Sequence, residues 1–143
     1  MSLIQTRPIS GAVGVDILHV DIRQPLSESV RAEIHKLWGQ HLVLRFRDQP
    51  LNDPELLAFS RALGDLEPPG PNPQGKPYLP EFPELNVISN IKQGDAPIGG
   101  LGDGEAIWHS DMTYAQRVRK GAVLHSIEVP PAGGNTYWSN LYL

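Results

Sequence analysis

Glycine and proline are concentrated in one stretch of this chain, and that concentration limits the folds open to it. Residues 64–104 hold sixteen of the twenty-eight glycines and prolines. Long regular elements are unfavourable there, because glycine is conformationally free and proline lacks a backbone donor. The apolar spacing predicts one strand in this stretch, over 85–89, between two loops. The second loop, 93–105, carries five glycines and is predicted to be a mobile lid.

The chain on either side of this stretch is predicted to alternate between short strands and helices. Ser27 is a suitable N-cap for the first helix. Asp53 is the expected N-cap of the second, with Pro54 at its first position and Gly64 at its end. The apolar spacing predicts strands over 14–18, 42–44, 122–129 and 136–139, and helices that begin near 28 and 54.

Composition narrows the class of protein. A chain of 143 residues with 40% apolar and 20% charged residues has the size and balance of one globular domain. The net charge of −4 argues against nucleic acid or an anionic membrane as a partner. Cysteine is absent, which excludes disulfides and thiol chemistry. The first residues do not resemble a signal peptide, so a cytoplasmic location is expected. The densest basic patch, Arg117, Arg119 and Lys120, is interpreted as a solvated turn.

The residues with the clearest chemical meaning are His109 and Asp111 in Trp-His-Ser-Asp. On a strand, residues two apart project to the same side, so the imidazole and the carboxylate would lie together. Such a pair forms two corners of a facial metal site with open positions. His-x-Asp alone is a weak signal, and a hydrogen-bonded surface pair is the simpler interpretation. A zinc hydrolase of the His-x-His-x-Asp type is disfavoured because residue 107 is isoleucine.

The sequence around this pair resembles that of the taurine dioxygenase-like (TauD/TfdA) family of iron(II)- and 2-oxoglutarate-dependent dioxygenases. A glycine-rich loop precedes Trp-His-x-Asp, as in that family. The similarity extends over nearly the whole chain, in the family's order. Its further segments are Arg-Phe-Arg-Asp-Gln at 45–49, Leu-Gly-Asp-Leu at 63–66, Gly-Ala-Val-Leu at 121–124 and Val-Pro-Pro-Ala-Gly-Gly-Asn-Thr at 129–136.

The resemblance implies an α+β, β-rich fold, a double-stranded β-helix (jelly-roll) with flanking N-terminal helices, incomplete in this chain. It implies an iron(II) enzyme that uses 2-oxoglutarate and O2 to hydroxylate a small organic substrate, with release of succinate and CO2. His109 and Asp111 match the first two iron ligands, and Thr136 matches the residue that contacts the 2-oxoglutarate carboxylate. Asn90, Met112 and Tyr114 are the expected substrate-binding residues.

Some positions depart from the family pattern. Val118 and Arg119 stand where many members have two prolines, and Asn135 stands where an aspartate is common. The segment after Gly-Asp-Leu, with Glu67, lacks the histidine of taurine-specific members, so taurine is a doubtful substrate.

The family's second ligand histidine and its 2-oxoglutarate-binding arginine fall beyond residue 143, and His125 is the nearest alternative ligand. Three alternatives follow. The chain is part of a longer enzyme, or it needs a partner, which would be a second copy or the missing C-terminal half. In the third alternative it is an inactive binding module with a partial metal site.

Overall fold

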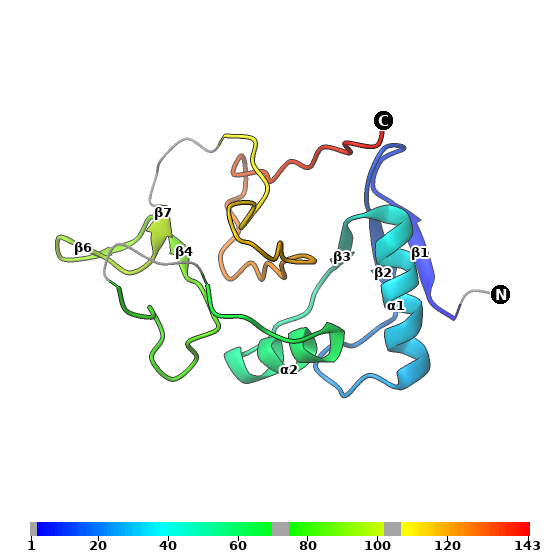
Figure 1. Ribbon diagram of the computed structural model, residues 1–143, viewed down its shortest axis with the longest axis horizontal. Coiled ribbons are helices and arrows are strands. Elements are labelled where there is room, and N and C mark those ends of the chain that lie inside the picture. Colours follow the sequence, from blue (N-terminus) through cyan, green and yellow to red (C-terminus); the bar gives the residue numbers. More distant parts are fainter. Residues whose placement is uncertain (1–2, 70–74, 102–106) are drawn as a thin grey trace. The chain divides into compact units, whose positions relative to one another are not determined.

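The computed structural model describes residues 3–69, 75–101 and 107–143 (Figure 1). The chain divides into two compact units, which are described separately. The first, here the N-terminal unit, comprises Met1–Gly64 and His125–Leu143; the second, here the central unit, comprises Asp65–Leu124. No helix in the described ranges has the length and apolar character needed to cross a membrane.

A three-stranded sheet forms the basis of the N-terminal unit. Its order is β1 (Gln5–Pro8), β2 (Val15–Leu18) and β3 (Leu44–Phe46), with β1 antiparallel and β3 parallel to the central β2. The parallel pair is connected through helix α1 (Glu28–His41), which runs alongside the sheet (Figure 1). The strand predicted over 14–18 is confirmed as β2, which begins one residue later. The strand predicted over 42–44 is wrong for its first two residues and overlaps β3 only at Leu44, because Leu42 is the C-cap of α1 and its amide donates to the Trp38 carbonyl.

Alternation along β2 determines which side chains form the core. Val15 and Ile17 are buried and pack in one cluster with Ile34 and Leu37 of α1 and with Ile4. Residues at alternate positions of a strand share a face, and this is the face that α1 covers. Burial of each such side chain contributes about 1.5–3 kcal/mol. The apolar spacing that predicts this strand and this helix therefore also predicts their contact.

Both helices begin at a capping residue. Ser27 accepts a hydrogen bond from the Val30 amide at 3.3 Å, as predicted for α1. For α2 (Asp53–Leu63) the predicted N-cap, Asp53, is wrong by one residue, because Asn52 is the cap. The Asn52 side chain accepts from the Glu55 amide at 2.9 Å, and the Glu55 carboxylate accepts from the Asn52 amide at 2.8 Å. This reciprocal box satisfies two helix donors, which a cap at Asp53 would not do.

A row of charge crosses the sheet on the face opposite the core. Asp16 of β2 lies in register with Arg7 of β1 and Arg45 of β3. Arg45 Nε donates to one carboxylate oxygen at 2.6 Å and Arg7 Nη2 donates to the other at 2.8 Å, while Arg47 Nε lies 3.7 Å away. The hydrogen bond from Arg45, and then that from Arg7, lower the pKa of Asp16 to about 2 against the opposing effect of burial. The sheet thus holds a buried carboxylate that stays charged.

The described part of the central unit has only short strands. β4 (Ile88–Ser89) pairs parallel with β7 (Gly100–Leu101), and β5 (Lys92–Gln93) pairs antiparallel with β6 (Ala96–Pro97). The strand predicted over 85–89 is present only in its last two residues, because the Leu85 amide is used in a turn with the Phe82 carbonyl at 3.0 Å. The predicted lid is a hairpin and a strand over its described part, 93–101; its residues 102–105 lie outside the described ranges.

The strands predicted over 122–129 and 136–139 are wrong for this structure. Both segments are described, and both are irregular. A strand requires a neighbouring strand to satisfy its backbone groups, and neither segment pairs with one here. The apolar side chains whose spacing led to the prediction, among them Ile127 and Val129, are exposed instead.

Candidate metal centre

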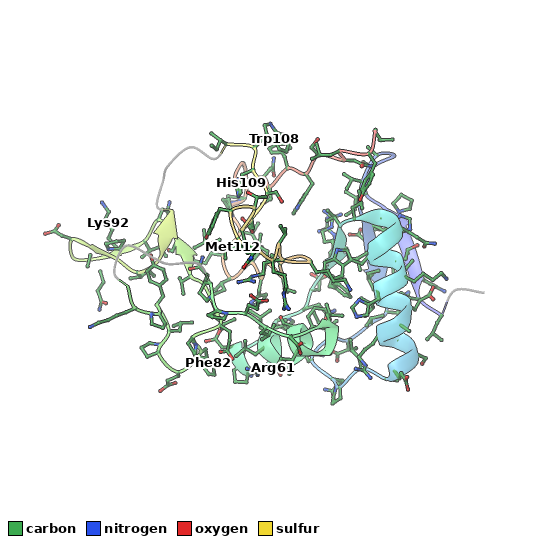
Figure 2. The ribbon with its side chains drawn as sticks, in the orientation of Figure 1. Arg61, Phe82, Lys92, Trp108, His109 and Met112 are labelled. Carbon is green, nitrogen blue, oxygen red and sulfur yellow. The ribbon has the colours of Figure 1, made fainter. Side chains whose placement is uncertain are left out.

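His109 and Asp111 lie together on the irregular segment that opens at residue 107. The segment is not the strand expected from the spacing. The two side chains nevertheless face one another, with His109 Nε2 3.3 Å from Asp111 Oδ1. Both are open to solvent, with side chains 62% and 67% exposed. Figure 2 shows His109 between its labelled neighbours Trp108 and Met112 on the same stretch of coil. Local turns therefore bring the pair together without help from a sheet.

A main-chain contact fixes the form of the His109 ring. Nδ1 lies 2.7 Å from the carbonyl oxygen of Ile107. A carbonyl oxygen only accepts, so Nδ1 carries the proton that is donated to it. In the neutral ring Nε2 then has the free lone pair, and Nε2 is the atom that faces Asp111. Metal-binding histidines are commonly oriented in this way, by a hydrogen bond from the nitrogen that does not bind the metal.

The same two neighbours affect the proton affinity of the ring. The Ile107 carbonyl and, after it, the charge of Asp111 raise the pKa of His109. Both favour the doubly protonated ring, because each presents an oxygen acceptor to an N–H. A cation bound between Nε2 and the carboxylate would replace that second proton and release it. In electrostatic terms the pair is thus arranged to hold a positive charge between its two members.

The geometry and donor types fit a transition-metal ion such as iron(II). Donors about 2.1 Å from a metal and at right angles to one another lie about 3 Å apart. The separation of 3.3 Å between Nε2 and Oδ1 is close to that value. Across the described ranges, however, no three histidine, cysteine, aspartate or glutamate side chains are grouped so that they could hold a metal. The described residues therefore offer two neighbouring donor atoms at this place, His109 Nε2 and Asp111 Oδ1.

The expected substrate-binding residues near this pair occupy different settings. Met112, at φ 56°, begins a turn in which its carbonyl accepts from the Ala115 amide at 3.0 Å. Tyr114 is exposed and its hydroxyl lies 3.0 Å from Met112 Sδ. Asn90 is exposed and directly follows β4. The structure joins Met112 and Tyr114 in one turn and shows no interaction of Asn90 with them.

Two further residues considered for the site belong to the N-terminal unit. Thr136 is exposed on the irregular segment that follows Gly133 and Gly134. His125, the alternative third ligand, is half-buried at the start of the same C-terminal stretch. The roles of both residues stay predictions.

An ion-pair cluster in the central unit was not predicted from the sequence. Arg117 Nη2 donates to Glu67 Oε1 at 3.0 Å, and Arg119 Nη1 pairs with Glu67 Oε2. The interpretation of the basic patch as a solvated turn is wrong for Arg119, whose side chain is only 27% exposed. A local reading of sequence gives no signal for a partner some fifty residues away.

The chain matches one protein family over nearly its whole length. The family model described as taurine catabolism dioxygenase TauD, TfdA family covers residues 5–143. An alpha-ketoglutarate-dependent 2,4-dichlorophenoxyacetate dioxygenase of Cupriavidus pinatubonensis is 30% identical over 99% of this chain and 51% of its own length. A pentalenolactone F synthase of Streptomyces avermitilis is 32% identical over 96% of this chain and 45% of its own length.

Among solved structures, a taurine dioxygenase from Burkholderia xenovorans matches 45% of this chain and 24% of its own, at 31% identity and a TM-score of 0.44. The chain therefore spans about half the length of the curated relatives that it matches.

Proposed function

Because this chain belongs to the taurine catabolism dioxygenase TauD, TfdA family, we propose that it provides two metal ligands of an iron(II)- and 2-oxoglutarate-dependent dioxygenase. The reaction converts a substrate R–H, 2-oxoglutarate and O2 into R–OH, succinate and CO2. The observation that carries the proposal is the facing pair of His109 Nε2 and Asp111 Oδ1, 3.3 Å apart. The names of the 2,4-dichlorophenoxyacetate dioxygenase and of a sulfate ester dioxygenase from Pseudomonas putida, 26% identical over 96% of this chain, agree with the dependence on 2-oxoglutarate.

The residues of this chain would act by holding and orienting. His109 offers Nε2 because the Ile107 carbonyl keeps the proton on Nδ1. Asp111 adds an anionic oxygen beside it, which lowers the net charge of a bound dication and favours retention of the metal. Iron(II), when bound, supplies the redox chemistry that couples 2-oxoglutarate decarboxylation to oxidation of a C–H bond. Because His109 and Asp111 would supply only two donors, coordination positions would remain available for 2-oxoglutarate and O2.

Four further residues are proposed to contact 2-oxoglutarate or the substrate, according to the chemistry of their side chains. Thr136 would donate its hydroxyl to a 2-oxoglutarate carboxylate. Asn90, Met112 and Tyr114 would contact the substrate, Asn90 through hydrogen bonds and the other two through apolar area. The substrate is proposed to be a small organic molecule, and taurine is disfavoured because Glu67 and its neighbours replace a histidine of taurine-specific members.

The proposal requires groups that this chain does not contain. A third ligand and an arginine for the distal 2-oxoglutarate carboxylate are expected in the half of its relatives' length that this chain does not span. The same half would supply the strands that complete a jelly-roll. Within the complete enzyme, segments 122–129 and 136–139 would then find the partners that strands need.

The test is turnover by the polypeptide encoded by the complete open reading frame. Succinate formation from 2-oxoglutarate is measured with iron(II), with a chelator, and with a panel of carboxylate, sulfonate and sulfate-ester substrates. The proposal expects succinate that depends on iron(II) and rises with at least one substrate. Binding of 2-oxoglutarate without any iron-dependent succinate would favour a non-catalytic binding module instead.

A further inference from the structure

The Glu67 carboxylate forms ion pairs with two arginines, one at each oxygen. Arg117 Nη2 donates to Oε1 at 3.0 Å, and Arg119 Nη1 pairs with Oε2. The acceptor and the donors are separated by fifty or more residues, so the cluster joins two distant segments of the central unit. We call Glu67, Arg117 and Arg119 the Glu67 clasp.

The two arms of the clasp differ in their access to solvent. The side chains of Glu67 and Arg119 are 30% and 27% exposed, whereas that of Arg117 is 84% exposed. An ion pair strengthens as water is removed from it, so the Arg119 arm is the stronger. Glu67 also precedes Pro68 and Pro69, and a residue before proline is restricted to extended backbone. Glu67 therefore loses little backbone freedom when it forms the clasp.

The clasp lies close in sequence to the proposed metal ligands. Arg117 follows Asp111 by six residues, and the turn that begins at Met112 lies between them. This segment has no strand partner among the described residues. Next to the ligand pair the segment makes local contacts: His109 Nδ1 with the Ile107 carbonyl, and the interactions within the Met112 turn. A coil without a ladder depends on side-chain contacts for its position.

We infer that Glu67 is a positioning residue for the His109–Asp111 pair, which it holds through Arg119 and Arg117. The clasp ties the C-terminal side of the ligand segment to residues 65–69 and so reduces the number of arrangements in which the two ligands stand apart. The inference rests on the proposed function, because it concerns the affinity of that same site for a metal. Under this inference, Glu67 affects the metal affinity of the site without itself binding the metal.

The experiment measures Mn(II) affinity of the complete open-reading-frame protein, with Mn(II) as an air-stable probe. Free Mn(II) is followed by electron paramagnetic resonance. Glu67→Gln keeps the shape of the side chain and removes its charge, and it is expected to weaken binding about threefold to tenfold, as the loss of two partly screened ion pairs allows. The double variant Glu67→Arg with Arg119→Glu restores one opposite-charge pair and is expected to bring affinity back to within about twofold of wild type.

The control is Asp21→Asn, which removes the acidic partner of Arg23 in a solvent-exposed pair of the other unit. It should leave the Mn(II) dissociation constant unchanged. Unaltered affinity in Glu67→Gln would overturn the inference, as would a loss that the charge swap does not recover. If Glu67→Gln fails to fold, Arg117→Gln, at an exposed side chain, must show a smaller loss in the same direction. Failure of the wild-type protein to bind Mn(II) would instead overturn the proposed function and, with it, this inference.

Discussion

At the scale of single residues, Asp16 shows how strongly one side chain depends on its neighbours. Its side chain is 3% exposed, yet the carboxylate stays charged because Arg45 and Arg7 donate to separate oxygens. The arginines are themselves partly exposed, which screens the interaction. The partners come from β1 and β3, and a local reading of sequence does not connect residues from three strands. The family resemblance includes the segment 45–49, but it does not indicate that Arg45 pairs with Asp16.

Removing the charge of Asp16 should destabilise the N-terminal unit. Asp16→Asn leaves the arginines facing an amide, and a cost of about 1–3 kcal/mol is expected from urea unfolding at pH 7. Asp21→Asn, at the exposed pair with Arg23, should change the unfolding midpoint little. Equal midpoints for Asp16→Asn and wild type would contradict the role assigned to the buried carboxylate.

The stabilisation from Asp16 should also depend on pH. Its pKa is lowered from 3.8 to about 2 by Arg45 and Arg7, so the folded state binds that proton less readily than the unfolded state. The contribution is therefore fully present above pH 3.8 and is lost as pH falls toward 2. The difference in unfolding midpoint between wild type and Asp16→Asn should shrink over that interval. A difference that stays constant from pH 5 to pH 2 would be inconsistent with this account.

At the scale of elements, the close approach of two backbone segments explains why residue 99 is a glycine, which the sequence pattern alone does not explain. At Gly99 a Cβ would lie 2.8 Å from the Val87 carbonyl oxygen and 2.9 Å from the Ser89 amide nitrogen. These contacts are with backbone, which cannot yield as a flexible side chain does. Gly39, inside α1, has no atom within 4 Å of the same position. The two glycines are therefore expected to respond in opposite directions.

Gly99→Ala should disrupt the β4–β7 ladder. An added methyl group against backbone atoms is expected to cost about 1–3 kcal/mol and to raise amide exchange at Gly100, whose amide donates to Val87 at 2.7 Å. Gly39→Ala is the matched substitution and should stabilise by about 0.5–1 kcal/mol, because alanine favours a helix interior. Hydrogen exchange and thermal unfolding measure both effects. Protection at Gly100 that survives Gly99→Ala would refute the close approach.

The elements that sequence predicts well are those with local causes. Ser27 and the apolar spacing suffice for α1, and the alternation of Val15 and Ile17 suffices for β2. The second cap is misplaced because Asn52 and Asp53 are both good caps, and only the bond between Asn52 and Glu55 selects one. The strands over 122–129 and 136–139 fail for a different reason: a strand depends on a partner that is distant in sequence, and none pairs with them here.

In the metal site, too, features with local causes could be predicted from the sequence, and features that depend on distant residues could not. Spacing alone places His109 beside Asp111, although the reason given, a strand, is incorrect; turns produce the same proximity. The contact of Nδ1 with Ile107 and the Glu67 clasp depend on backbone conformation and on a partner fifty residues away, so neither could be predicted from a motif. The family resemblance implies prolines at residues 118 and 119, and it therefore gives no indication that Arg119 is a member of the clasp.

At the scale of the whole molecule, apolar side chains near the C-terminal end lack cover. Residues 107–143 hold many large apolar side chains that are exposed, with Leu141 at 90%. The exposed apolar side chains are those of Ile107, Trp108, Tyr114, Val118, Val123, Leu124, Ile127, Val129, Tyr137, Trp138, Leu141, Tyr142 and Leu143. These side chains belong to both units, and exposure on this scale within each is typical of side chains that another chain or segment covers.

The 143-residue polypeptide should therefore associate in solution. Light scattering coupled to size exclusion is expected to show species larger than a monomer at micromolar concentration, and a hydrophobic dye should bind. A polypeptide that spans the full length of the matched relatives should bind less dye per chain, if residues outside 1–143 cover these side chains. A 143-residue monomer that binds no dye would show that these side chains are covered within the chain itself.

The central claim is that His109 and Asp111 bind iron(II), and the most direct measurement is metal retention by their variants. Iron(II) dissociation constants are measured anaerobically for the complete open-reading-frame protein and for His109→Ala, Asp111→Ala and His125→Ala. Loss of either proposed ligand should weaken binding at least about 100-fold, more than loss of a supporting contact does, whereas His125→Ala should bind as wild type does. Wild-type affinity in both His109→Ala and Asp111→Ala would contradict the assignment, and loss of binding in His125→Ala alone would move the metal to a different site.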